Sequence, residues 1–179
     1  MRYLSVLCGL LSSLTVSAHS MYSVCFTPQQ RCTTRIVNLI QTAKSSIFMQ
    51  AYMFTSSAIA DALLAAKHRG VKVELLADKS QFDCQHFSAV RGLLSKGIPV
   101  WADVQPVVAH NKVIIVDKKI VETGSFNYTY SAQHKNTENV LIIYNNALAR
   151  LYWQNWIARK KESLAVASSG CRDARGPAH

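Results

Sequence analysis

The stretch His110-Asn111-Lys112-Val113-Ile114-Ile115-Val116-Asp117 predicts a β-strand that ends in a turn. Its β-branched residues favour extended backbone, and Asp117-Lys118-Lys119 is typical of a tight turn. The chain then returns through Ile120-Val121-Glu122, so the segment predicts a hairpin. Alternate side chains of a strand share one face, and His110 and Lys112 are therefore expected to project together.

Strand and helix signals alternate on both sides of this hairpin. The predicted strands are 22–26, 46–54, 71–77, 98–101 and 138–144, and the predicted helices are 28–44, 56–70, one ending near Gly97, and 145–165. Ser56 or Ser57 can cap the second helix, and Asn145 or Asn146 the last. The order βαβα with a late hairpin predicts a layered α/β domain.

The first 18 residues have the pattern of a secretory signal peptide. Arg2 supplies the basic start, residues 3–14 are apolar, and Val16-Ser17-Ala18 fits a small-residue cleavage site. A membrane anchor is disfavoured because the apolar run is too short to span a bilayer comfortably. We therefore expect a periplasmic or secreted protein without a stable membrane span, with a catalytic domain at 19–167 and a C-terminal tail at 168–179.

Composition limits the class of protein and of partner. Apolar residues make up 49% and charged residues 17% of the 179 positions, which favours a globular chain over a disordered one. The formal net charge of +10 attracts polyanions. Nucleic acid and anionic lipid head groups both qualify, so charge alone does not choose between them.

Four cysteines follow the predicted cleavage site, namely Cys25, Cys32, Cys84 and Cys171. An even count in an exported chain favours two disulfides, for which three connectivities exist. Cys25 and Cys32 flank a Thr27-Pro28 turn and could pair locally. A zinc site built on Cys84 and His86 is disfavoured because a second CxxC-like pair is missing.

The hairpin carries side chains that suit phosphodiester cleavage. The imidazole of His110 can attack phosphorus and form a phosphohistidine, while Lys112 places positive charge on the non-bridging oxygens. Ser125 and Asn127 can donate hydrogen bonds to the same oxygens, and Gly124 permits close backbone approach. Each residue alone has an ordinary structural explanation, but the combination favours an active site. No carboxylate cluster for magnesium is evident, so we expect neither metal nor cofactor.

The pattern His110-x-Lys112-x4-Asp117-x6-Gly124-Ser125-x-Asn127 matches the HKD motif of the phospholipase D superfamily without a gap. Residues 51–55, 65–71, 97–100 and 135–139 also resemble the small, single-motif bacterial endonucleases of the Nuc-like subfamily. The resemblance implies a layered α/β/α sandwich with a mixed central sheet. The cysteines depart from the Nuc pattern, so no disulfide is carried over.

The resemblance also implies roles for individual residues. His110 would be the nucleophile, and Lys112, Ser125 and Asn127 would bind the phosphate. Glu138 matches a family carboxylate that hydrogen-bonds the histidine, which completes a catalytic set of His110, Lys112, Asn127 and Glu138. Asp117 lies a full strand away from His110, so we assign it, with Gly124, a structural role.

Catalysis through phosphohistidine needs a second group that protonates the leaving oxygen and later activates water. Larger relatives supply it with a second motif, whereas this chain has one. We therefore expect a homodimer in which a two-fold axis brings two copies of His110 into one shared site.

The motif does not decide the substrate. We favour a metal-independent, nonspecific endonuclease that cleaves DNA or RNA, with Phe82 and Phe87 as residues that could stack on bases. The alternative is a phospholipase D that converts phosphatidylcholine-type lipids to phosphatidic acid. That activity needs an exposed apolar surface beside the site, which Pro106-Val107-Val108 could supply. A non-catalytic binder of nucleic acid or envelope is a third hypothesis.

Overall fold

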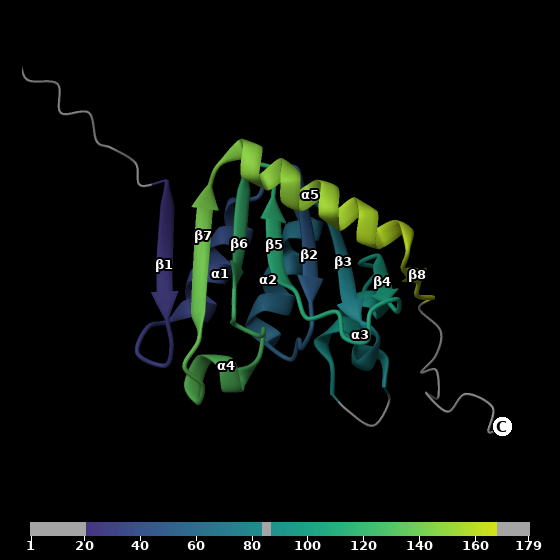
Figure 1. Cartoon of the computed structure of the whole chain (residues 1–179), viewed down its shortest axis with the longest axis horizontal. Coiled ribbons are helices and arrows are strands. Elements are labelled where there is room, and N and C mark those ends of the chain that lie inside the picture. The colour runs from purple at the N-terminus through teal and green to yellow at the C-terminus, as the bar shows by residue number, and fades with distance from the viewer. Residues whose placement is uncertain (1–20, 84–86, 168–179) are drawn as a thin grey trace, which may run out of the picture.

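The computed structural model describes residues 21–83 and 87–167. An eight-stranded sheet lies at the centre, in the order β1-β7-β6-β5-β2-β3-β4-β8 (Figure 1). The strands are β1 Tyr22–Phe26, β2 Ser46–Ala51, β3 Lys72–Asp78, β4 Val100–Asp103, β5 Lys112–Val116, β6 Ile120–Gly124, β7 Asn139–Tyr144 and β8 Leu164–Ala165. The helices are α1 Cys32–Thr42, α2 Ser57–His68, α3 Ala89–Ser95, α4 Tyr130–His134 and α5 Asn146–Lys161, with a 3-10 turn at Lys79–Phe82.

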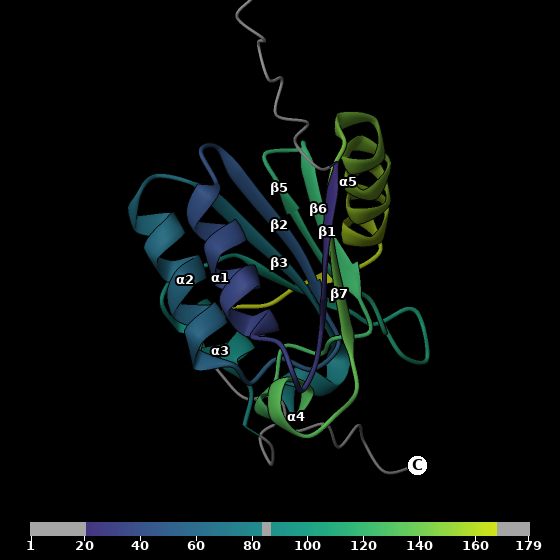
Figure 2. The ribbon, with the colours of Figure 1, turned by 90° about the vertical axis from the view of Figure 1, so that its left-hand side faces the viewer.

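Helices cover both faces of this sheet. α1, α2 and α3 pack on one face and α5 crosses the other (Figure 2). β2, β3 and β4 are parallel, and their other neighbours pair antiparallel. Trp156 of α5 is fully buried and donates a hydrogen bond to the carbonyl oxygen of Met49 on β2. The layered α/β/α sandwich with a mixed sheet is therefore confirmed.

Several boundaries differ from the sequence-based expectation. The first helix begins at Cys32 rather than Pro28, because residues 27–31 form a turn closed by the Cys25–Cys32 disulfide. The last helix ends at Lys161 rather than near 165, and β8 then pairs with β4. β2 ends at Ala51 instead of running to Phe54. The predictions for residues 1–18, Cys84, His86, Cys171 and the tail fall outside the described residues.

The strand registers bring the motif to one edge of the sheet. Ala51 at the end of β2 pairs with Lys112 at the start of β5, and Gly124 at the end of β6 pairs with Val140 near the start of β7. The loops that follow β2, β3 and β6, and the loop that precedes β5, meet at this edge, at the bottom of Figure 1. Within the described part of the chain, no helix is long and apolar enough to cross a membrane.

Candidate active site

His110 and Lys112 are in direct contact at this edge. His110 is exposed in the loop before β5, whereas Lys112 is only 5% exposed. The Nζ atom of Lys112 lies 3.0 Å from Nδ1 of His110 and 2.7 Å from the carbonyl oxygen of His110. The prediction that these two side chains project together is therefore confirmed, and the ammonium group of Lys112 lies beside the imidazole of His110.

Burial lowers the pKa of Lys112 from its usual value, and the nearby charge of Glu138 opposes the shift. The ammonium group thus has few water molecules to compete for its charge. A partly desolvated cation interacts more strongly with a phosphate oxygen than one in bulk water does. This environment suits the phosphate-binding role expected for Lys112.

The loop that carries His110 is anchored by a buried acid, Asp78, at the end of β3. Its Oδ2 accepts a hydrogen bond of 2.7 Å from the backbone N–H of Ala109, and its Oδ1 accepts one of 2.9 Å from Ser80. Lys79 donates to the carbonyl oxygen of Pro106. Asp78 thereby fixes the backbone next to His110, a role that sequence reasoning missed.

Ser125 and Glu138 form a second part of the site. Ser125 Oγ donates a hydrogen bond of 2.5 Å to Oε2 of Glu138 and accepts one from the backbone N–H of Asn139. The other carboxylate oxygen accepts from Asn136 Nδ2 at 2.9 Å. Among the described residues of a single chain, no hydrogen bond joins Glu138 to His110, so the expected contact stays a prediction.

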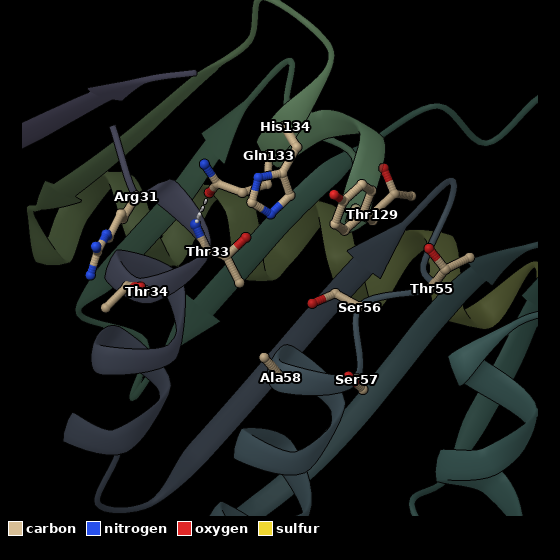
Figure 3. Close-up of a pocket in the computed structure, with 11 residues that line it drawn as sticks. Arg31, Thr33, Thr34, Thr55, Ser56, Ser57, Ala58, Thr129, Gln133 and His134 are labelled. Carbon is tan, nitrogen blue, oxygen red and sulfur yellow. Dashed lines mark hydrogen bonds between the residues drawn. The ribbon is translucent and has the colours of Figure 1, made fainter. Parts of the chain in front are cut away.

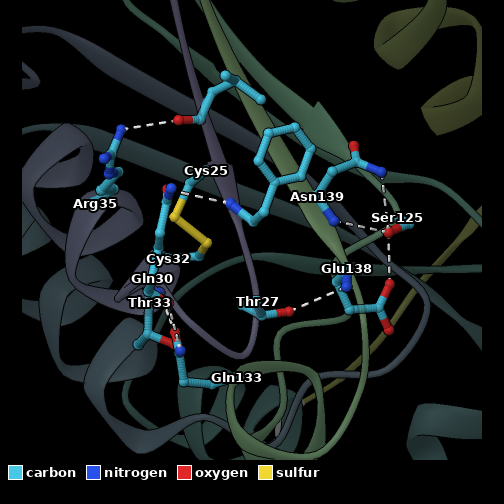
Figure 4. The surroundings of a disulfide bond; sticks show 12 residues. Cys25, Thr27, Gln30, Cys32, Thr33, Arg35, Ser125, Gln133, Glu138 and Asn139 are labelled. Atoms are coloured by element: carbon cyan, nitrogen blue, oxygen red, sulfur yellow. Dashed lines mark hydrogen bonds between the residues drawn. A yellow bond between two sulfur atoms is a disulfide. The ribbon is translucent and has the colours of Figure 1, made fainter.

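The segment around Glu138 is held by the disulfide loop (Figure 4). Cys25 and Cys32 are joined, which is the local pairing considered above. Between them, Thr27 donates its N–H to the carbonyl oxygen of Glu138 and accepts from the N–H of Glu138 through Oγ1, at 3.0 and 3.1 Å. Gln133 adds a bond from its Nε2 to the carbonyl oxygen of Gln30. The disulfide loop therefore positions a carboxylate of the site.

Asn127 and Gly124 lie at the same edge. The Oδ1 atom of Asn127 is buried, without a hydrogen-bond partner in the part of the chain described. Gly124 has no room for a side chain, because an added Cβ would lie 2.2 Å from the carbonyl oxygen of Asn139. The glycine therefore permits the close packing that sets Ser125 against β7.

Asp117 lies at the opposite end of β5, away from His110. Its carboxylate accepts hydrogen bonds from the backbone N–H groups of Lys44, Ser45 and Ser46 and from the hydroxyl of Ser45, at 2.7 to 2.9 Å. Burial alone would raise the pKa of Asp117, but these hydrogen bonds have the larger combined effect and lower it. The motif aspartate thus links the β5–β6 turn to the start of β2, which is a structural position.

A hollow of about 410 Å³ lies between the N-termini of α1, α2 and α4 (Figure 3). Hydroxyl side chains dominate its lining, together with Arg31 and His134. His134 is exposed and its ring packs on Tyr130, with the centroids 4.3 Å apart. The hollow contains none of the motif residues, so it is separate from the site above.

Comparisons with known proteins agree with this geometry. Residues 36–159 match the model of the family described as "Cardiolipin synthase, PLD-like domain". The chain is 49% identical to a phospholipase D of Rickettsia prowazekii over 86% of its own length and 75% of that protein. The chain belongs to the phospholipase D superfamily.

Two further members show how far the likeness extends. The crystal structure of Nuc from Salmonella typhimurium, a phospholipase D family member, superposes with a TM-score of 0.76 at 35% identity, over 82% of this chain and 97% of Nuc. Human mitochondrial cardiolipin hydrolase is 32% identical over 69% of this chain and 48% of its own length. As a member of the phospholipase D superfamily, the chain is a phosphodiester hydrolase.

Proposed function

We propose that the protein is a metal-independent phospholipase D that cleaves the head group from phosphatidyl lipids and leaves phosphatidic acid. The observation that carries this proposal is an exposed apolar rim beside the nucleophile. Val107 is 88% exposed and Val108 44%, three and two residues before His110. Met53, which follows the Tyr52 that contacts His110, is 43% exposed. Such a rim suits contact with the acyl region of a bilayer.

The relatives support the same choice. Five Rickettsia proteins named phospholipase D are 48 to 49% identical to the chain, whereas Nuc is 35% identical. This favours the lipid substrate over the nucleic acid that the sequence analysis preferred. An endonuclease is the second candidate, because the net charge of +10 and the likeness to Nuc fit a nucleic-acid substrate.

The proposed reaction has two displacements at phosphorus. A ring nitrogen of His110 bonds to phosphorus as the P–O bond to the head group breaks, and the departing oxygen takes a proton from His110 of the partner subunit. That second imidazole then removes a proton from water, which attacks phosphorus and breaks the P–N bond. Lys112 and Asn127 stabilise the non-bridging oxygens in both steps.

The proposed assembly is a homodimer, because one chain holds one motif and the reaction uses two imidazoles. A two-fold axis presents the same surface twice, so it doubles the motif. In one chain Glu138 bonds to Ser125 and Asn136. We infer that its contact with an imidazole forms when the shared site assembles.

Export to the periplasm or the medium is also part of the proposal. The Cys25–Cys32 disulfide supports it, because such bonds persist in oxidising compartments. Mass spectrometry of protein recovered from a bacterial host tests it. An N-terminus at His19 outside the cytoplasm is expected, and an uncleaved cytoplasmic chain would contradict it.

One paired assay tests the activity. Purified protein with EDTA is given phosphatidylcholine vesicles and plasmid DNA in parallel, with His110→Ala as the inactive control. Choline release that needs His110 is expected. Nicking without choline release would favour the endonuclease, and DNA binding without either reaction would favour a non-catalytic binder. Loss of choline release in EDTA would overturn the metal-independent mechanism.

The apolar rim has its own test. Val107→Ser with Val108→Ser should lower choline release from vesicles and leave hydrolysis of a soluble phosphodiester, bis(p-nitrophenyl) phosphate, unchanged. Tyr144→Ser is the matched control. Tyr144 is 48% exposed at the end of β7, and this end of the sheet lies opposite the one that carries the motif. Equal losses on both substrates would contradict a lipid-contact role for the rim.

A further inference from the structure

Tyr52 directly follows β2, and its ring contacts both His110 and Lys112. The ring centroids of Tyr52 and His110 are 4.5 Å apart, with a 50° angle between the planes. The Nζ atom of Lys112 lies 5.1 Å from the centroid of the same tyrosine ring. Tyr52 is not part of the HKD motif, yet its ring lies beside both His110 and Lys112.

We propose that Tyr52 is a positioning residue for the phosphodiesterase reaction, which orients the His110 imidazole and favours the charged form of Lys112. The proposal rests on the proposed function of those two residues. His110 is exposed, and its ring has one hydrogen-bond partner among the described residues, Lys112. An imidazole held by a single hydrogen bond can rotate, and a packed aromatic ring restricts that rotation.

The electrostatic part of the proposal follows from the cation–π geometry. The negative face of an aromatic ring attracts an ammonium group, most strongly where water is excluded. Lys112 is buried, which disfavours its charge, and Glu138 and the Tyr52 ring both oppose that cost. The ring also packs against the imidazole, which gains positive charge when it bonds to phosphorus.

The contacts involve the ring and not the hydroxyl. The structure gives the Tyr52 hydroxyl no hydrogen-bond partner within the described residues, so phenylalanine should replace tyrosine without loss. Tyr52→Phe keeps the aromatic face, and Tyr52→Leu removes it but keeps an apolar side chain. Comparing these two variants distinguishes a role of the aromatic ring from a merely structural role of the side chain.

The kinetic test measures hydrolysis of bis(p-nitrophenyl) phosphate by the full chain against pH. Tyr52→Phe should match the wild type, and Tyr52→Leu should lower kcat about tenfold. In Tyr52→Leu the alkaline limb should also move to lower pH, because Lys112 loses its proton more readily without the ring. An unchanged kcat and pH profile in Tyr52→Leu would overturn the proposal, as would a Tyr52→Phe variant as impaired as Tyr52→Leu.

A second measurement does not depend on activity. The ring protons of His110, assigned with His110→Ala, should show a ring-current shift in NMR spectra that Tyr52→Phe retains and Tyr52→Leu loses. Absence of that shift in the wild type would overturn the positioning role even if the enzyme is active. A normal shift in a protein without hydrolase activity would instead refute the proposed function. If Tyr52→Leu does not fold, Tyr52→Met replaces it in both experiments.

Discussion

The Nζ atom of Lys112 donates to Nδ1 and to the carbonyl oxygen of His110, so one ammonium group holds both the ring and the backbone of the proposed nucleophile. The lysine is buried, while the histidine is exposed to solvent. The charge of Lys112 therefore has two proposed effects: it orients the imidazole of His110, and it attracts the substrate phosphate.

Replacing Lys112 with methionine should strongly reduce hydrolysis and leave the fold intact. Methionine fills the buried space of the lysine chain but carries no charge, so a loss of about 10² to 10³ in kcat is expected. Because burial lowers the pKa of Lys112, wild-type activity should fall at a lower pH than ordinary lysine titration predicts. Two measurements check these expectations: the rates of the wild type and of Lys112→Met are followed across alkaline pH, and circular dichroism shows whether the variant is folded. Near-normal activity in Lys112→Met would contradict the role.

Replacing Asp117 with asparagine should reduce stability more than chemistry. The aspartate accepts four hydrogen bonds from residues 44–46, and the amide cannot replace them all. A loss of about 1–3 kcal/mol in the free energy of unfolding is expected, with kcat of the folded fraction retained. The pKa of Asp117 is lowered in the folded state, so its contribution is present at neutral pH and is lost as the pH falls through the folded pKa. Urea unfolding of the wild type and of Asp117→Asn at pH 7 and pH 3 measures this contribution. The difference in the free energy of unfolding between the two proteins should be smaller at pH 3.

Local patterns in the sequence predicted most of the sheet and much of the site. The β5–β6 hairpin follows from β-branched residues around a turn, and the Ser56 cap of α2 follows from its side-chain chemistry. By contrast, α4 is too short to show a helical period, and the two residues of β8 form a strand only because β4 offers an edge.

The parts of the site that were not predicted from the sequence depend on tertiary contacts. Tyr52 looks like an ordinary residue at a strand end, and Asp78 like an ordinary turn residue, until the fold brings the loop before β5 against them. An acid directly after a buried strand was the available signal for Asp78. The partners of Glu138 could not be predicted, because Thr27 and Ser125 reach it from the loops that follow two different strands, β1 and β6.

Removing the Cys25–Cys32 disulfide should lower stability and activity together. The bond closes a short loop, which in chain-entropy terms contributes about 2–3 kcal/mol. Thr27 inside that loop holds Glu138, so the loss of order should reach the site. Urea unfolding and choline release of the Cys25→Ser/Cys32→Ser variant, with Thr27→Val as a disulfide-intact comparison, measure the two effects. Full activity in both variants would mean that the loop does not position Glu138.

Glu122 should make stability fall as the pH rises. Its side chain is fully buried with Tyr128 as hydrogen-bond donor, and burial raises the pKa of Glu122 to about 8. The neutral acid is favoured in the folded state, so its contribution is complete below the ordinary pKa of 4.5 and is lost as the pH passes about 8. The free energy of unfolding should therefore drop by on the order of 3–5 kcal/mol across that window, relative to Glu122→Gln. Parallel pH slopes for the two proteins would show that Glu122 is already ionised in the fold.

Mixed dimers test whether two chains share one site. Wild-type and His110→Ala chains are combined in equal amounts, unfolded and refolded together, so that about half of the dimers contain one of each. A shared site needs both imidazoles, and about one quarter of wild-type activity should then remain, carried by the wild-type dimers. Independent sites would leave about one half. Differently tagged chains allow the mixed dimers to be purified, and Tyr144→Ser chains in place of His110→Ala control for losses on refolding. Purified mixed dimers with half the wild-type rate would show that each chain completes its own site.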